Sequence, residues 1–295
     1  MKNRKIVFFG TPDFVITVLD ALHRHFTIVG VITTPDAPLG RKQKLTPSPI
    51  KERALQLNLP VFTPQKLDDE LIRELTTVNC ELIVVASYGK IIPQSLLDVP
   101  SQGAINIHPS LLPKYRGATP VPAVILNGET ETGISFIQID SQMDHGPVIY
   151  QEKFRLTGQE TSQSLLKEIW QKAAELAPQI ISDFTGGKIE PRLQDHAIAS
   201  YCNLMSKEGG YFEIDNPPAP EVLDRMIRGY FPWPTAWTRW KGKIVKLLPD
   251  TVNPDIIGVN CGPRTVNYLV QLEGKNPIPL KDFLNGYPDF PLKNL

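Results

Sequence analysis

Two short, fully apolar runs limit what this chain can fold into. Ile6–Phe9 and Leu82–Ala86 contain no polar residue, so a strand built from either run must be buried on both faces. Phe14–His25 follows the first run with apolar residues at helical spacing, and Ile28–Thr33 is the next apolar run. Strand, helix and strand in this order are typical of a parallel sheet covered by helices.

We therefore predict an α/β fold with a Rossmann-like, mostly parallel sheet. A dinucleotide-binding turn needs three glycines after the first strand, and this chain has only Gly10 there. The sequence thus favours a Rossmann-like sheet without an NAD site.

Composition excludes several classes of protein. The chain has 295 residues, 41% of them hydrophobic and 21% charged, and its formal net charge is zero, which argues against a protein that coats nucleic acid through bulk charge. Cys80, Cys202 and Cys261 are widely separated, so neither a disulfide framework nor a metal site is expected. No apolar stretch approaches the roughly 18 residues of a membrane span, and a cytoplasmic location is expected.

The stretch from residue 104 to residue 148 contains an amide, an imidazole and a carboxylate that could form one site. Ala104–Ile107 indicates a strand, and its period of two places Asn106 and His108 on the same side. A second alternating run, Gly133–Asp140, leads into a loop that holds Asp144. If these two strands are neighbours, the loop brings a carboxylate to the amide and the imidazole.

An amide, an imidazole and a carboxylate suit the attack of an amine on a small acyl group. The amide and the imidazole donate to the developing oxyanion, and the carboxylate helps to remove the proton of the amine. Taken one at a time, the same residues have ordinary structural uses: Asn106 as a turn residue, His108 as a satisfied histidine, and Asp144 as a loop residue before a glycine.

The spacing of these residues resembles that of the folate-dependent formyltransferases, over nearly the whole chain, and most closely the group that acts on methionyl-tRNA. The resemblance rests on four motifs: Asn106-x-His108-x-Ser110-Leu111-Leu112-Pro113, Arg116-Gly117-Ala118, Gly128-x-x-x-Thr132-Gly133 and Asp144-x-Gly146. It implies transfer of a formyl group from N10 of 10-formyltetrahydrofolate to an amine, with Asn106, His108 and Asp144 as catalytic residues. The residues that it implies for folate binding are Ser110, Leu111, Leu112, Pro113, Tyr88, Gly89, Lys90 and Ile91.

A basic loop follows the second strand. Thr34–Pro49 contains five prolines or glycines, which we expect to keep it free of regular structure, and it carries Arg41, Lys42 and Lys44 against a single acidic residue. The resemblance implies that this loop contacts the acceptor arm of tRNA, whereas a mobile solvated loop is the alternative.

The last ninety residues change character. We place a domain boundary between residues 204 and 205, and the short strands expected after it, including Ile256–Val259 and Val266–Leu272, suggest a small β-barrel. The resemblance implies an oligonucleotide-binding type of barrel that binds tRNA. Arg239, Lys241 and Lys243 are spaced by two, so on an unbroken strand they would share one face, and Lys241 and Lys243 are candidate tRNA contacts, with a solvated edge strand as the alternative. A hairpin turn at Lys241-Gly242 would separate these two lysines.

The first hypothesis is therefore a monomeric enzyme, without a metal, that uses 10-formyltetrahydrofolate to formylate initiator methionyl-tRNA for translation. Two enzymatic alternatives are a formyltransferase acting on a small amine, such as an amino-sugar nucleotide, and a formyltetrahydrofolate hydrolase. A non-catalytic nucleic-acid-binding module is the alternative from another class, and it leaves the amide, imidazole and carboxylate unexplained.

Overall fold

The computed structural model describes residues 4–40, 43–250 and 268–292, which form two compact units. The first unit comprises Met1–Pro120, Glu131–Arg155 and Leu166–Asn203. The second comprises Val121–Thr130, Leu156–Leu165 and Leu204–Leu295.

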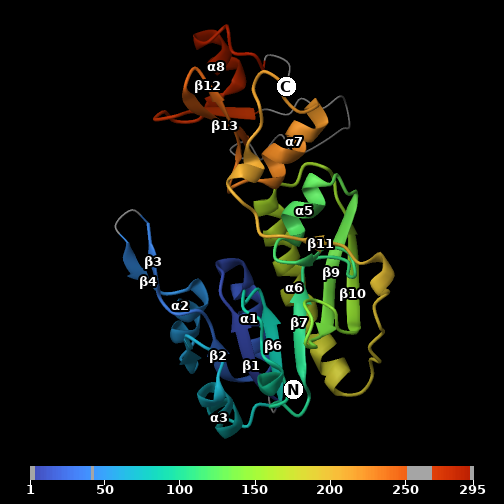
Figure 1. Ribbon diagram of the computed structural model, residues 1–295. Coiled ribbons are helices and arrows are strands. Elements are labelled where there is room, and N and C mark those ends of the chain that lie inside the picture. Colours follow the sequence, from blue (N-terminus) through green and yellow to red (C-terminus); the bar gives the residue numbers. More distant parts are fainter. Residues whose placement is uncertain (1–3, 41–42, 251–267, 293–295) are drawn as a thin grey trace. The chain divides into compact units, whose positions relative to one another are not determined.

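The first unit is built on a seven-stranded sheet (Figure 1). Its strands are β1 (Lys5–Gly10), β2 (Thr27–Ile32), β5 (Val61–Phe62), β6 (Leu82–Ala86), β7 (Ala104–His108), β9 (Glu131–Gln138) and β10 (Val148–Arg155). Their order is β10-β9-β7-β6-β1-β2-β5. The pairs from β7 to β5 are parallel, and β9 is antiparallel to both β7 and β10. The predicted, mostly parallel sheet is confirmed.

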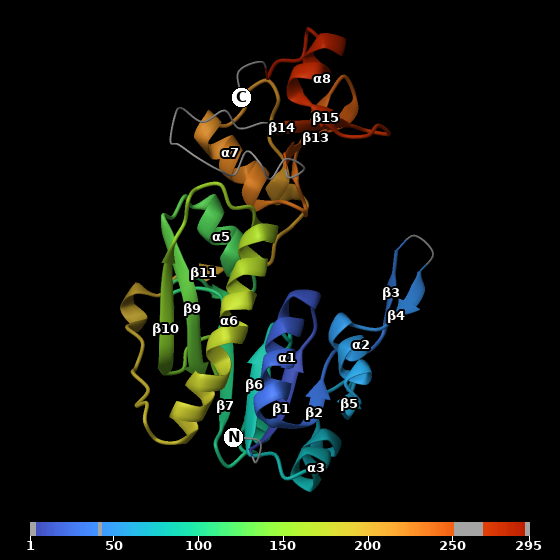
Figure 2. The same cartoon turned by 180° about the vertical axis from the view of Figure 1, so that it is seen from behind.

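Helices cover both faces of this sheet. The helices of the first unit are η1 (Asp13–Val15), α1 (Ile16–His25), α2 (Pro49–Gln56), α3 (Asp69–Thr77), α4 (Gln94–Leu97), most of α6 (Ser162–Thr185) and η2 (His196–Ile198), whereas α5 (Pro120–Leu126) falls almost entirely in the second unit. α1 and α6 lie together on the face seen in Figure 2, where Phe14 stacks on Trp170 with 5.9 Å between ring centroids. Among the described residues, no helix combines the length and apolarity needed to span a membrane.

The other face of the sheet is packed by α3 and α4. Val7 and Phe9 of β1 alternate with residues of the opposite face, and they join one buried cluster with Ile83 and Val85 of β6. Leu71 and Leu75 of α3 and Leu96 and Leu97 of α4 close this cluster. Residues 6–10 of β1 and all of β6 are buried on both faces, which is why these stretches have no polar side chain.

The strand order reverses next to β1, whose neighbours are β2 on one side and β6 on the other. The turns that leave β1 and β6 meet there, since Thr11 Oγ1 donates to the carbonyl oxygen of Tyr88 at 3.3 Å. β7 runs parallel to β6 with Asn106 opposite Val85, so its carboxyl end lies at the same edge of the sheet. In open α/β sheets, ligands bind at this edge, next to the strand-order reversal.

The expectation that prolines keep Thr34–Pro49 free of regular structure is wrong. β3 (Ala37–Leu39) and β4 (Lys44–Thr46) form an antiparallel hairpin in which Pro38 lies opposite Leu45. Both strands of a two-stranded ribbon are edges, so a proline without an N–H can face outward at no loss of a ladder hydrogen bond.

The second unit contains a four-stranded antiparallel sheet in the order β12-β13-β14-β15. Its elements are η3 (Glu208–Gly210), α7 (Pro220–Gly229), β12 (Ala236–Trp240), β13 (Lys243–Pro249), β14 (Tyr268–Leu272), β15 (Ile278–Pro279) and α8 (Leu280–Gly286). Trp240, Phe283 and Phe290 pack edge to face in its core, with ring centroids 5.1 to 6.3 Å apart. The strand expected at Ile256–Val259 lies outside the described residues. A mostly parallel sheet with helices, followed by a domain with an antiparallel sheet, confirms the predicted fold class.

Ser48 gives a direct test of how the first unit is held. Its Oγ caps α2 by accepting from Lys51 N at 3.0 Å and lies 2.7 Å from the buried hydroxyl of Thr33. We expect Ser48→Ala to lower the free energy of unfolding by about 1 to 2 kcal/mol, because the cap and the partner of Thr33 are both lost. Urea denaturation measures this change.

Ser95 is the matched control, because it is an exposed serine in the first turn of α4. Ser95→Ala should change the free energy of unfolding by less than about 0.5 kcal/mol. Equal effects of the two substitutions would contradict the capping role of Ser48.

Candidate active site

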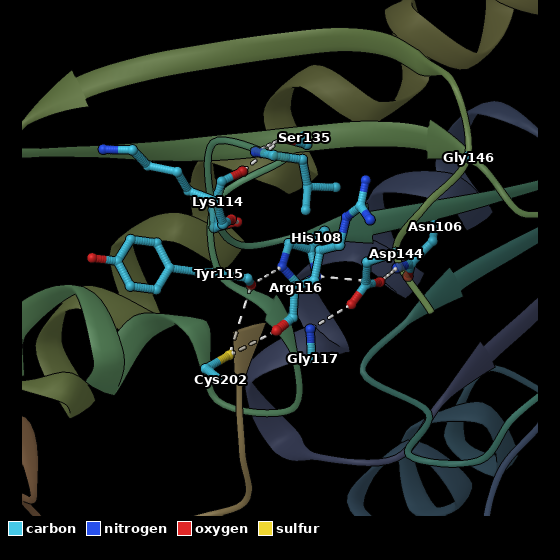
Figure 3. Close-up of polar contacts among 12 residues, drawn as sticks. Asn106, His108, Lys114, Tyr115, Arg116, Gly117, Ser135, Asp144, Gly146 and Cys202 are labelled. Atoms are coloured by element: carbon cyan, nitrogen blue, oxygen red, sulfur yellow. Dashed lines mark hydrogen bonds and ion pairs between the residues drawn. The ribbon is translucent and has the colours of Figure 1, made fainter. Parts of the chain in front are cut away.

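Asn106, His108 and Asp144 come together at the carboxyl end of β7 (Figure 3). Asn106 Nδ2 donates to Asp144 Oδ1 at 3.1 Å, and His108 Nδ1 lies 3.5 Å from the same oxygen. The side chains of His108 and Asp144 are 5% and 11% exposed. β7 and β9 are antiparallel neighbours, and the loop after β9 brings Asp144 back against Asn106 of β7.

The second ring nitrogen of His108 is also held. Nε2 lies 2.8 Å from the carbonyl oxygen of Tyr115. A carbonyl only accepts, so Nε2 must carry a hydrogen, and Nδ1 is the ring atom that faces the carboxylate. The imidazole is therefore fixed in both tautomer and orientation by backbone on one side and Asp144 on the other.

The second oxygen of Asp144 is held by backbone. Gly117 N donates to Oδ2 at 2.8 Å. Gly117 pairs with Cys202 between the short parallel strands β8 (Arg116–Gly117) and β11 (Tyr201–Cys202). Its φ of +107° and the carbonyl oxygen of Cys202, with which a Cβ would collide, leave room only for glycine. Asp144 therefore accepts from both a side chain and the backbone, which fixes the position of both of its oxygens.

The neighbours of Asp144 in its loop have other partners. His145 Nδ1 lies 2.7 Å from Asp140 Oδ2, and its ring stacks on His196 at 3.9 Å with planes 2° apart. Desolvation, and then the charges of His145 and Arg116, lower the pKa of His196. A guanidinium can only donate, so His196 Nδ1 accepts from Arg116 Nη2 at 2.8 Å.

The segment Ser110–Pro113, expected at the folate, directly follows β7 and is fixed by β9 and β10. Ser135 Oγ donates to the carbonyl oxygen of Ser110 at 2.6 Å and accepts from Leu112 N at 3.1 Å. Gln151 Nε2 donates to the carbonyl oxygen of Leu112 at 2.8 Å. Ser110 and Leu112 are buried, whereas Leu111 and Pro113 are half-buried.

The loop after β6 holds the other residues expected at the folate. The ring of Tyr88 is buried edge to face on Phe9 at 5.1 Å, and burial raises its pKa to about 12. Gly89, Lys90 and Ile91 are exposed, and Lys90 Nζ donates to the carbonyl oxygens of Pro64 and Gln65. Tyr88 therefore packs its side chain in the core, and its carbonyl oxygen accepts from Thr11, whereas the three residues after it are exposed.

The basic residues expected at tRNA fall in three places. Lys44 is exposed on β4, whereas Arg41 and Lys42 lie outside the described residues. Lys241 stands in the hairpin turn between β12 and β13, where it pairs with Asp289 and lies 4.6 Å from the centroid of the Trp240 ring. Lys243 is exposed at the start of β13. The two lysines are separated by a turn in which Lys241 and Gly242 both have positive φ.

Sequence reasoning missed the groups that hold Asn106, His108 and Asp144 in place. The carbonyl of Tyr115 and the N–H of Gly117 are backbone groups without a sequence signal of their own, although Arg116-Gly117-Ala118 belongs to the recognised pattern. Gln194, whose Nε2 donates to the carbonyl oxygens of Asp144 and Gly146, stands in no motif. Burial raises the pKa of the Cys202 thiol, so this nearby sulfur is not a ready nucleophile.

The described residues also include a cavity, but no cluster of potential metal ligands. A cavity of about 250 Å³ occurs within the second unit, between α7 and the ends of α5 and β10, and is lined in part by the ion pair of Asp224 and Arg228. Among the described residues, no cluster of three or more histidines, cysteines or carboxylates could hold a metal ion.

The chain is similar in sequence to known proteins over most of its length. Residues 4–181 match the family model described as formyl transferase. A protein of Chloroflexus aggregans named methionyl-tRNA formyltransferase is 40% identical over 252 residues, which is 85% of this chain and 81% of that protein. A protein of Geobacter metallireducens with the same name is 37% identical over 302 residues, which is 97% of this chain and 96% of that protein.

Solved structures share the fold at lower identity. An N-formyltransferase from Helicobacter canadensis, solved with folinic acid and dTDP-3-aminofucose, aligns with a TM-score of 0.62 at 20% identity and covers 94% of this chain and 98% of that chain. A 4-N formyltransferase from Francisella tularensis aligns with a TM-score of 0.64 at 18% identity, over 81% of this chain and 93% of that chain. With its matched domain, its relatives and its fold in agreement, the chain belongs to the formyl transferase family.

Proposed function

We propose that this enzyme transfers the formyl group of 10-formyltetrahydrofolate to the free amine of initiator methionyl-tRNA. The observation that carries the proposal is the nearly buried carboxylate of Asp144, held within reach of the Asn106 amide and the His108 imidazole. Relatives of nearly full length that are named methionyl-tRNA formyltransferase support this substrate over a small amine.

The reaction requires an oxyanion site and a proton acceptor but no nucleophilic side chain. The amine nitrogen forms a bond to the formyl carbon, the bond from that carbon to N10 of the folate breaks, and the proton lost by the amine is balanced by the one that N10 gains. Asn106 Nδ2 gives one hydrogen to Asp144, so its second hydrogen is available to the formyl oxygen.

His108 acts through Nδ1, since Nε2 is engaged with the carbonyl oxygen of Tyr115. The 3.5 Å between Nδ1 and Asp144 Oδ1 is an ion-pair distance rather than a full hydrogen bond. A protonated imidazole can therefore share Nδ1–H between the carboxylate and the developing oxyanion. Asp144 orients the ring and, directly or through one water, takes the proton from the amine.

Folate binding is assigned to the two segments at the carboxyl ends of β6 and β7. Ser110, Leu111, Leu112 and Pro113 form a turn that Ser135 and Gln151 hold rigid next to His108. The backbone of Tyr88, Gly89, Lys90 and Ile91 leaves the adjacent strand at the same edge of the sheet. A rigid turn beside an exposed backbone loop suits a flat, hydrogen-bonding pterin ring.

We assign tRNA binding to the hairpin β3–β4 and to the domain after residue 204, with catalysis in residues 1–204. At the base of the hairpin Asp36 is paired with Lys51 at 2.7 Å, so the acidic charge of the loop is already neutralised. Lys44 is then available to contact phosphate, and Arg41 and Lys42, which lie outside the described residues, are assigned to the same contact from the sequence alone. Lys243 is exposed, whereas Lys241 would have to exchange Asp289 for a phosphate.

The decisive experiment supplies 10-formyltetrahydrofolate together with either charged initiator tRNA or a panel of small amines. Formyl on the methionyl amine is the expected product. Formyl on sugar amines but never on aminoacyl-tRNA would overturn the substrate, and release of formate without any acceptor would identify a hydrolase.

Asp144→Asn tests the carboxylate. An amide keeps the size of the side chain but cannot accept a proton, so we expect kcat to fall by about 10² to 10⁴-fold. Asp98→Asn is the control, because Asp98 is an exposed carboxylate at the end of α4 that accepts from Gln94. A fully active Asp144→Asn enzyme would remove the carboxylate from the mechanism.

The pH profile tests the state of the substrate amine. Only the unprotonated amine has a lone pair for attack, so kcat/KM should rise with pH and level off at or below the value of about 8 typical of an α-amine. Steady-state rates with methionyl-tRNA across neutral pH measure this profile. A flat profile through the titration of the amine would mean that proton loss from the amine does not limit the reaction.

Lys44→Ala tests the hairpin. Loss of one phosphate contact should raise KM for methionyl-tRNA, leave KM for the folate unchanged, and reduce the slope of log kcat/KM against log salt by about 0.7 to 0.9. Lys172→Ala, at an exposed lysine of α6 paired with Glu175, is the matched control. The same salt slope in both variants would exclude Lys44 from the tRNA contact.

A further inference from the structure

Gln194 joins the loop of Asp144 to a buried arginine. Its Nε2 donates to the carbonyl oxygen of Asp144 at 2.9 Å and to that of Gly146 at 2.7 Å. Its Oε1 accepts from Arg116 Nη2 at 2.7 Å and from Nε at 3.3 Å. The side chain is 7% exposed, so every polar atom of this amide is used inside the protein.

Arg116 decides which way the amide of Gln194 faces. A guanidinium can only donate and a carbonyl can only accept, so Oε1 must face Arg116 and Nε2 must face the loop. Arg116 is itself 2% exposed, and Tyr201 Oη at 3.2 Å and His196 Nδ1 at 2.8 Å are its other partners. These acceptors are neutral, so in the described chain the arginine is held by a network and not by a carboxylate.

This pair of side chains connects the two backbone segments that hold the reacting groups. Arg116 lies between the carbonyl of Tyr115, which accepts from His108, and the N–H of Gly117, which donates to Asp144. Gln194 binds the loop of Asp144 through the carbonyl oxygens of Asp144 and Gly146. Asp144 has a φ of +50°, a backbone conformation that a non-glycine residue keeps only where its surroundings hold it.

We propose that Gln194 is a positioning residue for the Asp144 carboxylate, and that Arg116 orients Gln194 for this task. The inference rests on the proposed function, because it assigns Gln194 to the same reaction. The bonds that Gln194 gives to the loop keep the carboxylate between Asn106, His108 and Gly117. Without them the loop can relax from its left-handed conformation, and a displacement of about 1 Å at a reacting group costs about 10²-fold in rate.

Gln194→Glu separates the two sides of the amide. A glutamate keeps an oxygen for Arg116, so the buried arginine stays paired, but it cannot donate to the two loop carbonyls. We expect kcat to fall by about 10- to 100-fold with KM for both substrates little changed, since the substrates contact other residues. Gln194→Met, which removes both sides, should show the same loss of kcat if it folds.

Gln151→Glu is the matched control. Gln151 Nε2 also donates twice, to the carbonyl oxygen of Leu112 and to Ser135 Oγ, both at 2.8 Å, but it holds the segment assigned to the folate. In an Asp144→Asn background, Gln194→Glu should cause no further loss of kcat. Gln151→Glu should lower kcat by the same factor in this background as in the wild-type enzyme. A full additional loss from Gln194→Glu in that background would overturn the positioning role.

Amide hydrogen exchange tests the inference without any substrate. Gly117 N–H donates to Asp144 Oδ2, so its exchange rate reports whether the carboxylate is in place. It should rise at least about tenfold in Gln194→Glu, toward the rate in Asp144→Ala, and stay unchanged in Gln151→Glu. Unchanged protection at Gly117 in Gln194→Glu overturns the inference even in a protein that formylates nothing, whereas an inactive wild-type enzyme overturns only the proposed function.

Discussion

The candidate site depends on how one nearly buried carboxylate is satisfied. A carboxylate removed from water needs donors, and Asp144 receives them from the Asn106 amide and the Gly117 backbone, with His108 Nδ1 3.5 Å from its Oδ1. These donors come from β7 and from the turn after it, more than twenty residues away in sequence. The strand order therefore fixes where this carboxylate lies, because it decides which donors are placed next to it.

The sheet supplies the rigidity that this arrangement needs. β6 and β7 are parallel and central, so their carboxyl ends are fixed by ladder hydrogen bonds on both sides. β9 is antiparallel to β7, so its last residue, Gln138, lies opposite Ile105 near the start of β7. The loop that follows β9 then runs back and places Asp144 against Asn106 and His108.

Much of the fold could be predicted because its signals are local. Apolar runs on both faces of β1 and β6 and the helical spacing before β2 need no distant partner to be recognised. The hairpin β3–β4 was missed since prolines argue against strands in general, and only the pairing of Pro38 with Leu45 shows that the missing N–H lies on an outer edge. The hairpin turn at Lys241 was one of two possibilities that the sequence left open, and the ion pair of Lys241 with Asp289 had no local signal because it joins residues 48 positions apart.

The sequence alone determined the class of sheet, the presence of an amide, an imidazole and a carboxylate at spacings suited to one site, and the resemblance to formyltransferases. These follow from periodicity and residue type, which are properties of short stretches of chain. Only the tertiary structure decided that Tyr115 and Gly117 hold His108 and Asp144 through backbone atoms, and that Gln194 reaches the Asp144 loop across fifty positions. Backbone groups are the same in every residue, so their use depends on which segments the fold places side by side.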